Sequence, residues 1–117
     1  MMNQDSNQQI PLACSLTADE LHVRGSEIAA LGDQVQEVCE LADGYAFAFA
    51  SDAGIAHALL DFVVAERACC PFFTFTLAFP APHQTVWLHV QGREGVKEII
   101  AASGFASAIE RQAAKAS

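Results

Sequence analysis

Apolar and polar residues alternate in two stretches of the chain, and each stretch predicts a pair of antiparallel strands. The first pair turns at Asp43-Gly44, a strong short signal for a tight hairpin, and the second turns at the Pro-rich residues 80–82. In the second pair, large apolar residues occupy every other position, which favours a sheet with one apolar face. The expected strands are residues 35–41, 45–49, 73–79 and 85–91.

Helices are predicted by capping residues and by apolar residues at helical spacing. The segment Thr17-Ala18-Asp19-Glu20 is a capping box, in which two side chains satisfy backbone amides at the start of a helix. Ser51 or Asp52 caps a second helix, and Pro71 ends it because proline disfavours helical geometry in the residue before it. The expected helices are residues 17–32, 52–70 and 96 onward, and a short edge strand over residues 10–16 precedes them.

The order of these elements, β-α-ββ-α-ββ-α, predicts an α+β fold. We expect an antiparallel sheet of four to five strands with the helices on one face, which buries the apolar face of the sheet. Residues 1–10 are polar and predict a disordered tail, and residues 11–117 predict a single domain. A chain of 117 residues with 52% hydrophobic types is long enough to bury a core without disulfides.

The acidic composition of the chain excludes some classes of binding partner. Only 17% of the residues are charged, and the formal net charge is −8. Nucleic acids and anionic membrane surfaces both attract clustered Lys and Arg, so we expect neither as a partner. The polar start has no signal-peptide pattern, and no apolar run is long enough for a membrane helix. We therefore expect a cytoplasmic protein, in which cysteines stay reduced.

Four cysteines carry most of the functional signal. Cys69 and Cys70 are adjacent at the predicted end of the second helix, directly before Pro71. Such a pair is poorly suited to an ordinary disulfide, but thiolates are the ligands that soft metal ions prefer. Cys14 is a candidate third thiol if its strand lies near that helix end, whereas Cys39 is expected to pack inside a strand. Against this stands the frequent burial of cysteine as a small hydrophobic residue.

Other residues are candidates for supporting roles around the thiols. Arg67 would favour the thiolate form, and Glu66 would accept or deliver a proton, although both also fit a solvated helix end. Phe72 would give the thiols an apolar neighbourhood, and His89 shares a predicted strand face with Trp87. The sequence shows no phosphate-binding loop and no other motif that calls for an organic cofactor.

Four stretches of the chain resemble one group of small, uncharacterised bacterial proteins. The resemblance covers residues 12 to about 101, and its most specific part is Cys69-Cys70-Pro71-Phe72. The stretches are Cys14-Ser15-Leu16-Thr17, Asp43-Gly44-Tyr45-Ala46-Phe47, the run from Glu66-Arg67-Ala68-Cys69-Cys70-Pro71 to Phe75, and Val86-Trp87-Leu88 followed by residues 92–98. Similar stretches are associated with mercury-type and other heavy-metal-responsive regulators. The resemblance implies that Cys14, Cys69 and Cys70 are the residues to carry over as metal ligands.

Three hypotheses follow. The leading one is a soft-metal-binding protein, with Hg(II) or a related thiophilic ion held by Cys69, Cys70 and Cys14, for sequestration, delivery or sensing. The second is a thiol-dependent enzyme of organometal or redox chemistry with Glu66 as the acid, although nothing in the sequence demands catalysis. The third is an interaction domain with structural cysteines, which would form a homodimer through exposed strand edges.

Overall fold

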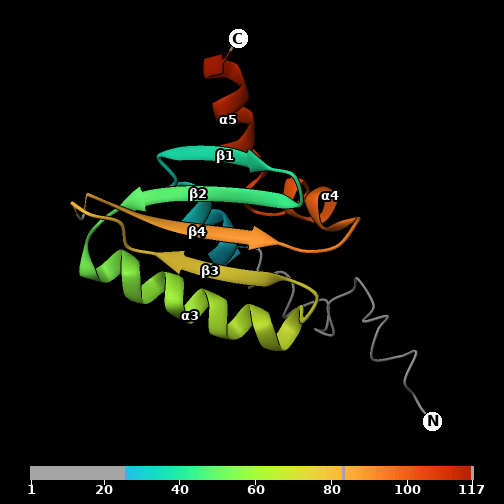
Figure 1. The fold of residues 1–117 in the computed structure, drawn as a ribbon, viewed down its shortest axis with the longest axis horizontal. Helices are drawn as coiled ribbons and strands as arrows, with labels where there is room; N and C mark the ends of the chain where they lie inside the picture. Colours follow the sequence, from blue (N-terminus) through green and yellow to red (C-terminus); the bar gives the residue numbers. More distant parts are fainter. Residues whose placement is uncertain (1–25, 83, 117) are drawn as a thin grey trace.

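Both strand pairs belong to one antiparallel sheet of order β1-β2-β4-β3 (Figure 1). The computed structural model describes residues 26–82 and 84–116. Its strands are β1 (Glu37–Leu41), β2 (Gly44–Ala50), β3 (Thr74–Ala78) and β4 (Thr85–Gln91). Its helices are residues 26–32, α3 (Ala53–Cys69), α4 (Val96–Ala101) and α5 (Ala106–Ala116). The central strands β2 and β4 pair along their whole length, from Gly44 opposite Gln91 to Ala50 opposite Thr85.

One face of the sheet forms the core. A row of apolar residues crosses it from strand to strand, since Val38 pairs with Phe47, Phe47 with Leu88, and Leu88 with Leu77. Phe47 and Leu88 are both 0% exposed. The helical segments cover this face: Phe105, which precedes α5, stacks on Phe47 with ring centroids 4.5 Å apart.

The opposite face of the sheet is shielded by its own large side chains. Ala46 and Ala48 of β2 are buried there, and they pair across the strands with His89 and Trp87 of β4. Cross-strand neighbours on one face lie close enough for a large ring to cover a small residue. The small residues of β2 therefore lie next to the larger side chains of β4 on this face.

α3 presents one side to the core and another to solvent. Its N-cap is Asp52, whose carboxylate accepts a hydrogen bond from the Ile55 amide at 2.9 Å. Leu59 is 0% exposed and faces the core, whereas its neighbour Leu60 is 50% exposed. The helix ends at Cys69, one residue before the expected end, because Cys70 leaves helical geometry ahead of Pro71.

The chain after β4 forms two short helices that are held against neighbouring elements. Lys97 of α4 donates a hydrogen bond to Glu40 of β1, and this bond raises the pKa of Lys97. Between α4 and α5, Gly104 packs against the helix of residues 26–32: a Cβ on Gly104 would lie 2.6 Å from the Ala29 amide nitrogen. That position therefore requires glycine.

The α+β prediction, with helices over one face of an antiparallel sheet, is confirmed for the described residues. The first strand begins at Glu37 and not at Val35, because the Val35 amide bonds to the Gly32 carbonyl in the turn that ends the preceding helix. The predicted tail, the edge strand at residues 10–16 and the capping box lie outside the described residues. Within residues 26–82 and 84–116, no helix is long and apolar enough to span a membrane.

Candidate metal centre

Cys70 lies in the turn that joins α3 to β3, and its backbone is held from both sides. Its amide donates to the Glu66 carbonyl at 2.6 Å, and its carbonyl accepts from the Phe73 amide at 3.3 Å. The residue belongs to the hydrophobic core cluster and is 8% exposed. The turn therefore places the Cys70 thiol in a fixed and largely dry position.

The end of α3 carries charges of both signs. The last carbonyls of a helix carry partial negative charge, which opposes an isolated thiolate but attracts a positive ion. Arg67, the basic residue in the last turn of α3, is exposed. A metal ion bound at this end would complement both the helix dipole and the thiolates that hold it.

Glu66 is the buried charged residue of the described chain, at 6% exposed. It precedes Cys70 by one helical turn, and it lines a small, partly open cavity of about 30 Å³ together with Phe62, Phe73 and Phe75. Ser103 also lines this cavity, but its hydroxyl donates to the Ile100 carbonyl and accepts from the Phe105 amide. From the sequence, Glu66 and Arg67 could both have been solvent-exposed at the helix end. In the structure Arg67 is exposed, whereas Glu66 is buried.

Aromatic side chains follow Cys70 in the chain and contact one another. Phe72 is 9% exposed and contacts Phe73 edge-on, with ring centroids 4.7 Å apart. Phe73 in turn contacts Phe75 of β3 at 5.6 Å. A thiol site at Cys70 would consequently lie beside rings that exclude water and lower the local dielectric constant.

Other predicted residues lie apart from Cys70. His89 shares a strand face with Trp87, but that face is opposite to the core that contains Cys70. Cys39 is exposed, so the prediction that it packs is wrong. The reason is the alternation of an edge strand: in β1 it is Val38 that points into the core, and the next side chain must point outward.

The other two thiols of the predicted site, those of Cys14 and Cys69, lie outside the part of the chain that the structure describes. Cys14 lies outside the described residues, and Cys69 is the last residue of α3, with its side chain outside the described part. Over the described residues, no three or more His, Cys, Asp and Glu side chains group in a way that could hold a metal ion.

Comparisons with known proteins add no relative. Family models, curated proteins and solved structures were all searched, and none matches this chain.

Proposed function

We propose that this protein binds a soft, thiophilic metal ion, with Hg(II) as the type case, through Cys69 and Cys70 and with Cys14 as a third thiol. The observation that carries the proposal is the turn at the end of α3. There a buried cysteine leaves helical geometry directly after a second cysteine, beside Phe72 and Phe73. Soft ions bind thiolate far more readily than oxygen ligands, so this residue pair selects their class.

The setting of the pair supports an ion that stays bound. Two thiols on one short segment act as a chelate, because the second sulfur binds at a high effective concentration once the first is attached. The negative end of the helix favours a cation, and the aromatic walls protect the metal–sulfur bonds from water. We place the protein in the cytosol, where thiols remain reduced, and its role in sequestration, delivery or sensing of the ion.

The test is Hg(II) retention against excess glutathione, measured by native mass spectrometry. A single protein thiol exchanges its ion with a large excess of a monothiol, whereas a chelating pair keeps it. We expect the parent and Cys39→Ser to retain one ion, and Cys69→Ser/Cys70→Ser to lose it. The proposal fails if the double variant retains Hg(II) as well as the parent, or if the parent loses it as readily as the variant.

Burial of Glu66 favours a second candidate function, protonolysis of an organomercurial. In that reaction the second thiol binds the mercury of a thiolate-bound R–Hg group and gives its proton to the Glu66 carboxylate. The carbon–mercury bond then breaks, and carbon takes this proton from Glu66 to give R–H, so that no oxidant or reductant is needed. The cavity of about 30 Å³ beside Glu66 has room for a methyl-sized group.

Methane release from methylmercury separates binding from catalysis. If the reaction occurs, Glu66→Gln abolishes methane release while Hg(II) retention persists, because the substitution keeps the shape of the side chain and removes its acid. Glu37→Gln, at an exposed position of β1, is the matched control and retains release. Absence of methane from the parent, or unchanged release from Glu66→Gln, rules this second function out and leaves ion binding intact.

A further inference from the structure

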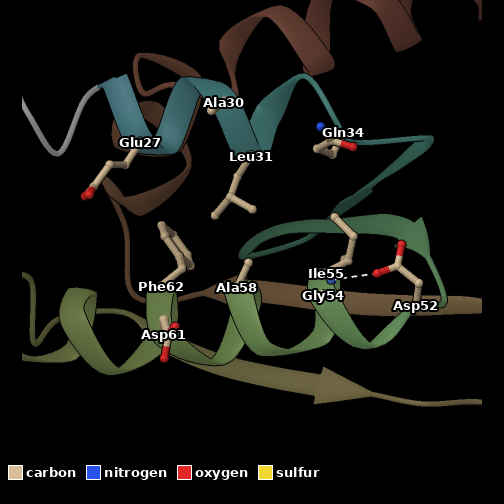
Figure 2. A pocket seen from close by; sticks show the side chains of 10 residues that line it. All are labelled: Glu27, Ala30, Leu31, Gln34, Asp52, Gly54, Ile55, Ala58, Asp61 and Phe62. Atoms are coloured by element: carbon tan, nitrogen blue, oxygen red, sulfur yellow. Dashed lines mark hydrogen bonds between the residues drawn. The ribbon is translucent and has the colours of Figure 1, made fainter.

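A groove runs between the helix of residues 26–32 and the N-terminal half of α3, away from the cysteine turn (Figure 2). Its volume is about 630 Å³, within the range of roughly 300–1,000 Å³ typical of ligand pockets. Leu31 and Phe62 point into it from its two walls, and Ile55 and Ala58 extend its apolar lining along α3 (Figure 2). The groove is open to solvent along its length.

Acidic side chains border this apolar lining at both ends. Glu27 and Asp61 lie at one end and Asp52 at the other (Figure 2). None of the ten described residues that line the groove is basic. The chain as a whole carries a net charge of −8, so its overall field has the same sign as these carboxylates.

We propose that this groove docks a cationic amphipathic segment of a partner protein. Its apolar side chains would enter between Leu31, Ile55 and Phe62, and its Lys or Arg residues would face the carboxylates at the two ends. An amphipathic helix in an apolar groove is a common mode of peptide recognition, and opposite charges at the rim set orientation and association rate. The proposal does not depend on metal binding, because no cysteine lines the groove among the described residues.

The probe is a synthetic helical peptide of Leu and Lys, titrated into the isotope-labelled full chain and followed by amide chemical shifts. We expect the largest shifts at Leu31, Ile55 and Ala58, and no binding of the matched peptide with Glu in place of Lys. Shifts centred elsewhere, or equal binding of the two peptides, would overturn the proposal.

Charge-reversal variants test whether the carboxylates of the groove are responsible. Glu27→Lys/Asp61→Lys is expected to weaken binding of the Leu/Lys peptide by about tenfold or more, since two attractive surface pairs become repulsive. The control Glu37→Lys/Glu94→Lys changes the net charge equally, at exposed positions off the groove. It is expected to weaken binding of the peptide by less than about twofold, because salt screens distant charges. Equal weakening by both pairs contradicts a specific groove.

A third variant tests the apolar lining, and oligomeric state tests the identity of the occupant. Ala58→Gln adds neutral bulk to the groove wall, so it should weaken binding of the peptide. Glutamine is a good helix former, so the circular dichroism spectrum of the protein should stay unchanged. Unchanged affinity contradicts docking in the groove. If sedimentation shows a dimer of the parent that the groove variants dissociate, the occupant is a second copy of this chain and the partner proposal is wrong.

Discussion

At the scale of single residues, burial distinguishes Cys39, which was expected to pack and is exposed, from Cys70, which is buried. Cys39 follows a core residue on an edge strand and is exposed, whereas Cys70 follows a helix end and belongs to the core cluster. Alkylation requires access to the thiolate, so reactivity follows exposure. The structure therefore predicts two very different thiols on one small chain.

Iodoacetamide labelling of the native protein checks this difference. We expect Cys39 to be alkylated quickly and Cys70 slowly, with Cys70 reacting as fast as Cys39 once the chain is unfolded in urea. Peptide mapping by mass spectrometry measures both sites in one sample. Equal rates in the native protein would contradict the burial of Cys70.

Leu59 and Leu60 offer a second comparison at this scale, because they are neighbours with opposite environments. Leu59→Ala removes a side chain that is 0% exposed, so it should lower the free energy of unfolding by about 2–5 kcal/mol. Leu60→Ala alters a side chain that is 50% exposed, so it should change the free energy of unfolding by less than about 0.5 kcal/mol. Urea denaturation of the two variants measures the difference, and similar losses would show that α3 packs in another orientation.

At the scale of elements, prediction succeeds where the signal is local. Asp43-Gly44 marks the β1–β2 turn, Asp52 caps α3, and Pro71 ends it, because each acts through its own backbone geometry. The break between α4 and α5 was not predicted, although Ser103-Gly104 lies there and the Ser103 hydroxyl accepts a hydrogen bond from the Phe105 amide. Gly104 allows the helix of residues 26–32 to approach the chain there, and no local pattern records that neighbour.

Gly104→Ala tests this close approach. Its Cβ would lie 2.6 Å from the Ala29 nitrogen and 2.8 Å from the Ile28 carbonyl carbon, so backbone must move, at a loss of about 1–3 kcal/mol. Gly54→Ala is the control: its Cβ would meet only the Asp52 carboxylate at 3.2 Å, and alanine is the better helix former. Thermal unfolding should show a lower Tm for Gly104→Ala alone. An unchanged Tm for Gly104→Ala would contradict the packing.

At the scale of the whole molecule, the fold class was predictable and the arrangement of surfaces was not. The period-two pattern predicted which face of β4 is buried, since Val86, Leu88 and Val90 alternate with less buried residues. It did not predict that Glu66 is buried, because helix-end charges are usually solvated. Nor did it predict the acidic groove, whose lining residues come from helices far apart in the sequence.

The two proposals place different chemistry on the two halves of α3. Its N-terminal half forms one wall of the acidic groove, and its C-terminal end leads into the cysteine turn. Phe62 lines both the groove and the small cavity beside Glu66, so one core ring separates the two. Binding of a soft metal ion by Cys69 and Cys70 is the more specific of the two proposals, because thiolates are the ligands that soft ions prefer.

X-ray absorption spectroscopy of the complex with one Hg(II), prepared in excess glutathione and then freed of it, tests that claim most directly. We expect a mercury coordination shell made of sulfur alone in Cys39→Ser, supplied by the protein's own cysteines, and no retained mercury in Cys39→Ser/Cys69→Ser/Cys70→Ser. A shell that contains nitrogen or oxygen, or a sulfur shell that persists without Cys69 and Cys70, would contradict it.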